Sequence, residues 1–364
     1  MNETPHGAAI AVVVPVFNRM EFLEATVASL RAQTMNNAEF ILVDDRSELH
    51  FWRYLESLPG QDRRFRILRK PDHIPRGCQS SRNIGLDACG AKAVMFLDSD
   101  DLIGAECLED RHAMVESNPD ADLVVGPQAM FTHPAGPLRW VNVPRPGVSE
   151  LDRFLDVAGP LDVPWVNGGV VIRMRSLNAA GIRWRPGFHW DDVAFHFECL
   201  VAGLRVEWMS FTGPADAYYR MHHGERYGAV LSAPDGVRSA TKMFGWMWRT
   251  LEDADRGTQR RREALAVSFF HSCVLRSIDA GNSRSRESSL SKRRRTAPFR
   301  RLTPTICEGI EWGARYSSHH RAPSTIGTSS RAAISPATSS STLPRRTERF
   351  RRSRREQPPR CMLC

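Results

Sequence analysis

Short apolar runs alternate with amphipathic stretches through the first hundred residues of this chain. The runs Ile10–Val16, Phe40–Val43, Phe65–Leu68 and Ala93–Leu97 are too short for buried helices, which predicts strands buried on both faces. The segment 20–33 between two of them places its apolar residues at helical spacing. Alternating strands and helices of this length predict an α/β fold with a doubly wound, mainly parallel sheet.

Acidic residues follow two of the predicted strands directly. Asp44 and Asp45 end one strand, and Asp98 and Asp100 follow another. Ligands of doubly wound sheets lie beyond the carboxyl ends of the strands, so these carboxylates are expected at one site. In an extended chain Asp98 and Asp100 point the same way, and such a pair suits Mg2+ or Mn2+ with nucleotide phosphates as further ligands. The alternative is that Asp100 or Asp101 is the N-cap of the helix expected over 105–115.

The net charge of +9 is concentrated at the C-terminal end of the chain. The segment from Gly281 onward contributes +14, so the preceding residues carry about −5. This tail is rich in Arg, Ser and Pro and has few spaced apolar residues, which predicts disorder. Three interpretations stay open: a surface for RNA or acidic lipids, a solvated appendage, or translation from a shifted reading frame. No specific nucleic-acid recognition is expected.

The sequence predicts a cytoplasmic protein with reduced thiols. No apolar run reaches the roughly 20 residues that span a bilayer, and the N-terminus has no secretory pattern. The aromatic helices expected over 239–251 and 263–276 are interpreted as core helices, with peripheral membrane contact as the alternative. Single cysteines are scattered through the chain, and Cys361 and Cys364 have no second pair at zinc-site spacing.

Two common nucleotide-binding motifs are absent from the sequence. The first predicted strand is not followed by GxGxxG, and the chain has no GxxxxGK[ST]. A dinucleotide-dependent oxidoreductase and a P-loop enzyme are therefore disfavoured.

Five sequence segments together carry a family resemblance. They are Val12–Arg19, Ile41–Ser47, Ser81–Gly85, Asp98–Asp101 and Trp190–Asp192. In this order and spacing they resemble the family 2 glycosyltransferases of GT-A fold. The resemblance implies an inverting, metal-dependent transfer of a sugar from a nucleotide-diphosphate donor, preferentially a UDP-sugar, to a glycan or lipid-linked acceptor. The chain lacks the QxxRW signature of processive synthases, which favours transfer of one sugar at a time.

The resemblance also implies how the first segments bind the donor. It places Pro15, Phe17 and Asn18 beside the base and ribose, with Asp45 or Asp44 at the uracil edge. The alternative for this acidic pair is that it caps the next turn.

The third and fourth segments are expected at the phosphates. Arg82 and Asn83 would lie near the diphosphate or donor sugar, since a planar guanidinium suits phosphate; a surface arginine is the alternative. Gly85 would permit close helix packing. Asp98 and Ser99 complete the expected donor site.

Metal ligands and the general base follow from the same resemblance. Asp100 is expected to coordinate Mn2+ or Mg2+ together with Asp98. His222 is the candidate third ligand and His223 its substitute, with a surface His pair as the alternative.

The last segment supplies the catalytic acids. Asp192 is expected to take the proton of the acceptor hydroxyl, and Asp191 to orient the acceptor. Both acids would also be suited to cap a helix starting at Val193.

These inferences divide the chain into four parts. Residues 1–125 form the nucleotide-sugar half and 126–230 a mixed α+β acceptor half. Residues 231–280 form C-terminal helices and 281–364 the basic tail. Two other functions stay open: a nucleotidyltransferase that makes sugar nucleotides, and an inactive sugar-nucleotide-binding relative.

Overall fold

The computed structural model describes residues 7–132, 139–140, 147–155, 164–188, 190–210, 214–221 and 234–270. At 139–140 and 234–235 it describes the backbone alone. Several expectations lie outside the described residues: the tail after residue 280, the pair Cys361 and Cys364, and the candidate ligands His222 and His223.

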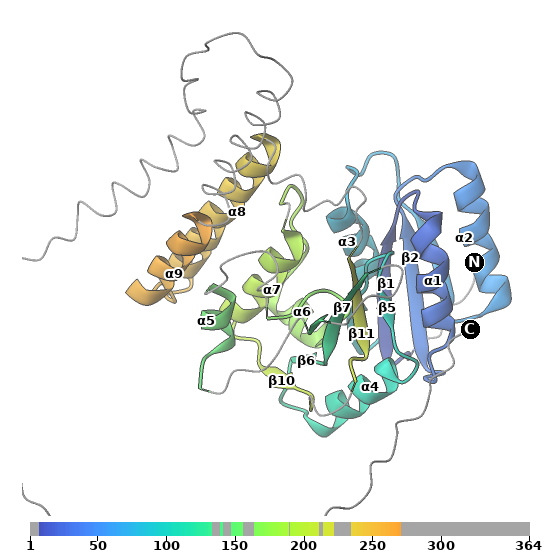
Figure 1. The fold of residues 1–364 in the computed structure, drawn as a ribbon, viewed down its shortest axis with the longest axis horizontal. Helices are drawn as coiled ribbons and strands as arrows, with labels where there is room; N and C mark the ends of the chain where they lie inside the picture. Colours follow the sequence, from blue (N-terminus) through green and yellow to red (C-terminus); the bar gives the residue numbers. More distant parts are fainter. Residues whose placement is uncertain are drawn as a thin grey trace, which may run out of the picture. The chain divides into compact units, whose positions relative to one another are not determined.

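Strands and helices alternate through the first part of the chain, as the sequence predicts (Figure 1). The elements are β1 (Ile10–Val16), α1 (Met20–Arg31), β2 (Ala38–Asp44), α2 (Leu49–Gln61), β3 (Phe65–Arg69), α3 (Cys78–Ala88), β4 (Ala93–Phe96), β5 (Leu102–Ile103) and α4 (Cys107–Ser117).

The second part mixes short strands with helices. Its elements are β6 (Leu123–Val125), β7 (Gln128–Thr132), β8 (Arg139–Trp140), α5 (Glu150–Leu155), β9 (Val170–Arg173), α6 (Met174–Ala180), α7 (Asp191–Val201), β10 (Val206–Trp208), β11 (Ala217–Met221), α8 (Pro234–Asp253) and α9 (Gln259–Phe269).

The main sheet is mostly parallel, which confirms the predicted fold class. Among the described residues it has seven strands in the order β10-β6-β9-β4-β1-β2-β3. Only β9 runs antiparallel to its neighbours, β4 and β6. A smaller sheet with the order β5-β11-β7-β8 comes from the mixed half, and the sequence pattern did not resolve it.

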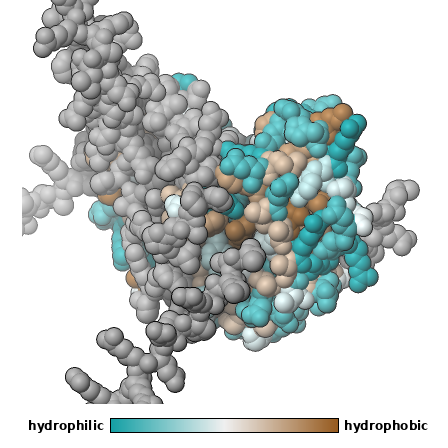
Figure 2. All heavy atoms as spheres, turned by 45° about the vertical axis from the view of Figure 1, so that its right-hand side comes forward, coloured by the Kyte–Doolittle hydropathy of each residue, from teal (hydrophilic) through white to brown (hydrophobic). Residues whose placement is uncertain are grey.

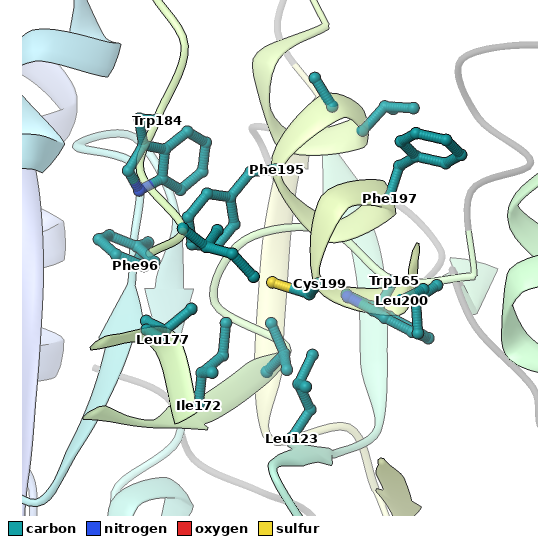
Figure 3. Packing of buried hydrophobic residues seen from close by; sticks show 14 of the residues in the cluster. Phe96, Leu123, Trp165, Ile172, Leu177, Trp184, Phe195, Phe197, Cys199 and Leu200 are labelled. Carbon is teal, nitrogen blue, oxygen red and sulfur yellow. The ribbon is translucent and has the colours of Figure 1, made fainter. Parts of the chain in front are cut away.

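Side chains alternate between the two faces of the main sheet and build a core on each. Val12 and Val14 of β1 belong to one cluster, with the buried faces of α1 and α2. Val13 and Phe96 belong to the other, with residues of α3, α6 and α7. Figure 3 shows part of this second core, where Phe96, Trp184 and Phe195 lie together. The period of two along each strand therefore explains the layers of helices on both sides.

Helix α3 approaches β1 unusually closely at Gly85. A Cβ atom at this position would lie 2.4 Å from Cγ1 of Val13. No side chain larger than hydrogen fits this contact without movement, which confirms that Gly85 permits close helix packing.

The C-terminal helices α8 and α9 belong to the second core. Met243, Met247 and Leu265 are almost fully buried, as expected for packing helices. Val267 and Phe270 of the last turns remain exposed, at 56% and 49%.

Figure 2 shows a face on which hydrophilic residues surround smaller hydrophobic areas. No helix in the described ranges has the length and apolarity needed to cross a bilayer, and membrane contact stays a prediction.

The acidic segment after β4 corrects two expectations. The backbone N–H of Asp101 donates to the carbonyl of Asp98 at 3.1 Å, so the segment turns and is not extended. The alternation expected for Asp98 and Asp100 along a strand is therefore wrong. Helix α4 begins at Cys107, with Glu106 before it, so the acids do not cap this helix either.

Candidate active site

The parallel strands bring their acidic ends to one edge of the main sheet. Val16 of β1 pairs with Asp44 of β2, and Val13 pairs with Phe96 of β4. All three strands run in the same direction, so the residues that follow them emerge together. Asp45 and Asp98 consequently lie at the edge where a doubly wound sheet binds ligands.

Arg82 of α3 links two carboxylates at this edge. Its Nη2 donates to Oδ1 of Asp98 at 2.5 Å, and its Nη1 donates to Oδ2 of Asp191. The guanidinium carbon also lies 4.3 Å from the ring centroid of Trp184. The Arg82 side chain is only 3% exposed, so the alternative of a surface arginine is wrong.

The charge of Arg82 is secured by its two partners. Burial acts against the charged form, but attraction to Asp191 and Asp98 outweighs it and holds the pKa of Arg82 well above its usual value. Loss of either carboxylate would leave a buried charge less compensated. The three side chains therefore form one electrostatic unit.

Asp191 is the first residue of α7 and is held from two sides by α3. Besides Arg82, the thiol of Cys78 donates to its Oδ2 at 3.3 Å. Burial raises the pKa of Asp191, and Arg82 works in the opposite direction. Both contacts fix the orientation of this carboxylate.

Asp192, the next residue, is the candidate general base. Its Oδ1 accepts the backbone N–H of Val193 at 2.8 Å. Burial, followed by repulsion from Asp191, raises the pKa of Asp192 to about 7. A base is most effective when its pKa lies near the working pH. Helix α7 begins at Asp191 and not at Val193, so both acids lie in its first turn and neither is its N-cap.

The acidic turn after β4 is anchored by neighbouring elements. Thr26 of α1 donates to the carbonyls of Ser99 and Asp101 at 3.0 and 2.9 Å. The buried carboxylate of Asp101 accepts the backbone N–H of Arg220 at 2.8 Å, and Nε of Arg220 donates to the carbonyl of Asp100. The side chain of Asp100 pairs with Arg19 at 3.2 Å. These contacts fix the turn from α1 and β11.

Asp98 and Asp100 are the candidate ligands of a divalent cation among the described residues. Their carboxylate oxygens are ligands that Mg2+ and Mn2+ prefer, and both side chains are partly exposed. Across the described ranges, no group of three or more His, Cys, Asp or Glu side chains is arranged to hold a metal. Two carboxylates fit a cation that keeps open positions for water or phosphate oxygens.

The residues expected beside the nucleobase of the donor lie in different surroundings. Phe17 is 42% exposed at the end of β1, while Pro15 lies within that strand. Asn18 adopts a positive φ of 44° and accepts the backbone N–H of Glu48 at 2.9 Å. It therefore joins the loops that follow β1 and β2.

The two acids at the end of β2 make different contacts. Asp44 is fully buried and accepts the backbone N–H of Ser47 at 3.0 Å, so it caps the following turn. Asp45 accepts the backbone N–H of Gly77 at 2.7 Å and pairs with Lys70 at 2.7 Å. Of the two acids, Asp45 keeps some exposure, at 11% of its side chain, and is the better candidate for contact with a ligand.

Asn83 is engaged with the segment between α6 and α7. Its amide donates to the carbonyl of Trp184 at 2.8 Å and accepts the N–H of the same residue at 2.9 Å. These bonds position Trp184 under the guanidinium of Arg82. The expected contact of Asn83 with the donor stays a prediction.

Sequence reasoning missed several residues that build this site. Lys70, Cys78 and Trp184 come from segments that carried no recognised motif. The position of Lys70 directly after β3 was the one available signal, because the ends of parallel strands share an edge. The other contacts join distant segments and depend on the tertiary fold.

Comparison with known proteins identifies the segment that holds most of these residues. Residues 11–153 match the model of glycosyl transferase family 2. This segment belongs to glycosyl transferase family 2. The family 2 segment includes Arg82 and the acidic turn, whereas α7 lies beyond the matched residues.

Curated relatives resemble this family 2 segment over part of their length. Glycosyltransferase GlyG of Streptococcus pneumoniae is 32% identical over 117 residues, which are 32% of this chain and 38% of GlyG. Poly(ribitol-phosphate) beta-N-acetylglucosaminyltransferase TarP of Staphylococcus aureus is 33% identical over 124 residues, 32% of this chain and 36% of TarP. The chain therefore matches less than two fifths of the length of these relatives.

Solved structures share the fold over a longer range. Residues 1–349 of S. aureus TarS, in complex with UDP-GlcNAc, superpose with a TM-score of 0.58 and 19% identity, covering 72% of each chain. Mannosyltransferase PcManGT from Pyrobaculum calidifontis, in complex with GDP-Man and Mn2+, gives a TM-score of 0.50 and 15% identity, covering 85% of this chain and 80% of PcManGT. The similarity to TarS supports a GT-A type fold that extends beyond the family 2 segment.

Proposed function

We propose that this chain is an inverting glycosyltransferase that moves a sugar from a nucleotide-diphosphate donor to an acceptor hydroxyl of a glycan or lipid-linked substrate. The observation that carries the proposal is the Arg82 bridge. It connects Asp98, beside the candidate cation ligand Asp100, with Asp191, beside the candidate base Asp192. One buried guanidinium thus holds the candidate donor-side acid Asp98 and the neighbour of the candidate base, so that both sides of a single displacement would be kept in place.

Asp192 would take the proton from the attacking hydroxyl. With a pKa of about 7 it is ionised in a substantial fraction of molecules at neutral pH and still binds a proton readily. Its Oδ1 is held by the N–H of Val193, which leaves Oδ2 for the acceptor hydroxyl. Asp191 and Arg82 would keep the start of α7 in place and compensate the charge of the site.

Asp98 and Asp100 would hold Mn2+ or Mg2+ together with the donor. The bound cation would stabilise the negative charge of the departing nucleoside diphosphate. The carboxylates are oxygen ligands on a turn that Thr26 and Arg220 fix. His222 remains the candidate further ligand and lies outside the described residues.

A UDP-sugar is the favoured donor class. The TarS structure whose fold resembles this chain contains UDP-GlcNAc, and TarP is named as an N-acetylglucosaminyltransferase. PcManGT was solved with GDP-Man, so a GDP-sugar is the second donor class to test. The acceptor is proposed only as a glycan or lipid-linked hydroxyl compound.

The test measures release of nucleoside diphosphate by the full chain from UDP-, GDP- and dTDP-sugars, with and without Mn2+ or Mg2+. We expect metal-dependent release from one donor class, reduced at least 100-fold by Asp192→Asn and by Asp100→Asn. A parallel incubation with nucleoside triphosphate and sugar phosphate checks for pyrophosphate, the product of a nucleotidyltransferase.

A matched control uses Asp120, whose side chain is 83% exposed. Asp120→Asn makes the same chemical change on the surface and should retain full activity. Equal activity of the Asp192 and Asp120 variants would contradict the assignment of the base. No release from any donor, with no binding of nucleoside diphosphate, would contradict the proposed transferase as a whole.

A further inference from the structure

Lys70, the residue that follows β3, has an unusually enclosed ammonium group. Its side chain is fully buried, and Nζ lies 2.7 Å from Oδ1 of Asp45. Nζ also donates to the hydroxyls of Ser80 and Ser81 at 3.0 and 3.2 Å and to the carbonyl of Gly77 at 3.1 Å. Lys70 therefore joins the ends of β2 and β3 to the first turn of α3.

The contacts of Lys70 fix one side of the Asp45 carboxylate. Oδ1 is buried against the ammonium, with Arg46 a further 3.5 Å contact. Oδ2 accepts the backbone N–H of Gly77 at 2.7 Å. A carboxylate oxygen accepts more than one hydrogen bond, and the side chain of Asp45 is 11% exposed. One edge of the carboxylate is thus left for an incoming donor.

An exposed aromatic ring lies beside this edge. The backbone N–H of Asp45 donates to the carbonyl of Val16 at 2.8 Å, so the backbone of Asp45 lies beside the start of the loop that carries Phe17. Phe17 is 42% exposed, and the guanidinium carbon of Arg76 lies 4.9 Å from its ring centroid. A flat apolar ring next to an accepting carboxylate suits a planar heterocycle that carries an N–H group.

We propose that Lys70 is a positioning residue for nucleobase recognition, which holds Asp45 so that its open edge accepts a hydrogen bond from a base N–H. The inference rests on the proposed function, because the ligand is the nucleotide of the sugar donor. Uracil and guanine present a ring N–H on their pairing edge, whereas cytosine presents an acceptor nitrogen. The Lys70–Asp45 pair therefore favours UDP or GDP and disfavours CDP.

If Lys70 only stabilised the fold, its substitution would have a different effect. Joining β2, β3 and α3 would stabilise the fold whichever base is bound, and its loss would leave the relative affinities for bases unchanged. Recognition through Asp45 instead links Lys70 to the ratio of the UDP and CDP affinities. The ratio is therefore the readout, rather than affinity or melting temperature alone.

The experiment measures dissociation constants of UDP, GDP and CDP by calorimetry, with Mg2+, for the full chain and three variants. We expect the wild type to bind UDP or GDP at least tenfold more tightly than CDP. Lys70→Met and Asp45→Asn should each reduce this ratio to within about threefold. Lys92→Met, which changes an exposed lysine, should retain the wild-type ratio.

The double variant Lys70→Met with Asp45→Asn tests whether Lys70 acts through Asp45. If it does, the double variant has the same ratio as Asp45→Asn alone, and this comparison also serves if Lys70→Met by itself does not fold. A wild-type ratio in Lys70→Met, or a ratio further lowered in the double variant, would overturn the proposal. Failure of the wild type to bind any nucleoside diphosphate would instead overturn the proposed function with it.

Discussion

Arg82 of α3 forms a buried ion pair with Asp191 at the start of α7, 109 residues further along the chain. Through its other nitrogen the same guanidinium reaches Asp98. The family 2 segment thereby contacts the helix that carries the candidate base. We infer that donor binding and base positioning depend on this one cation.

Replacing Arg82 by Met should impair both stability and activity. Two buried or half-buried carboxylates would lose their partner, which typically costs about 3–5 kcal/mol of the free energy of unfolding. We expect a lower melting temperature and at least a 100-fold loss of kcat, measured by thermal denaturation and nucleotide release.

The control for Arg82 is Arg205, which pairs with Asp120 on the surface and is 60% exposed. Arg205→Met should change the unfolding free energy by less than about 1 kcal/mol, because exposed ion pairs contribute little. Equal effects of the two substitutions would contradict the special role of the Arg82 bridge.

The activity should fall on acidification because Asp192 must be ionised to accept a proton. Its pKa is raised to about 7, so kcat should decrease tenfold per pH unit below about pH 6.5. The pH profile of kcat for the identified donor checks this. A profile that is flat between pH 5 and 8 would contradict Asp192 as the base.

The same carboxyl group should weaken the fold when it ionises. Its pKa is higher in the folded chain than in the unfolded chain, so the contribution of Asp192 to stability is most favourable below pH 4 and declines as pH rises through about 7. Asp192→Asn should therefore melt at a higher temperature than the wild type at pH 8, and the difference should shrink at pH 5. A variant that is less stable at pH 8 would contradict this linkage.

His196 should change the stability of the fold with pH in the opposite direction. It is fully buried among the rings of Phe154, Trp165 and Phe195, and its nitrogens have no hydrogen-bond partner in the described part of the chain. Burial, followed by repulsion from Arg82, lowers the pKa of His196 to about 3.

Since the unfolded chain binds the His196 proton below about pH 6.5, the wild type loses stability as pH falls, by roughly 2 kcal/mol at pH 5. His196→Leu should abolish this part of the acid sensitivity, as unfolding in denaturant at pH 7.5 and 5 would measure. An unchanged pH dependence would show that the histidine is already protonated or does not titrate on unfolding.

The contact between Gly85 and Val13 gives a test of the packing of α3 on the sheet. Gly85→Ala places a methyl group 2.4 Å from Val13 and should cost about 1–3 kcal/mol. The second substitution Val13→Ala should recover part of this loss in a double-mutant cycle. Gly60→Ala in α2 meets no atom within 4 Å and should be neutral or slightly stabilising.

Local patterns in the sequence were sufficient to predict strands β1 to β4 of the main sheet and the edge of its site. Apolar runs as short as β1 and β2 form buried strands more readily than buried helices. Because parallel strands end at the same edge of a sheet, Asp45 and Asp98 must come to that edge together. The close packing of α3 at Gly85 was expected from the family resemblance.

Contacts between distant segments could not be predicted from such patterns. Nothing near Lys70 in sequence indicates that its ammonium meets Asp45, and the partners of Arg82 depend on where α7 packs. The turn at Asp98 was misjudged because strand periodicity was extended as far as Asp100, whereas β4 ends at Phe96. The local sequence does not determine at which residue the hydrogen bonds between two neighbouring strands stop.

The most direct test of the proposed single displacement is the configuration of the sugar that the full chain releases from its donor. Proton NMR during hydrolysis of the donor with Mn2+ or Mg2+ can observe the first anomer formed, before mutarotation. We predict the configuration opposite to that in the donor, and loss of this product in Asp192→Asn. Initial release of the anomer present in the donor would contradict the proposed mechanism.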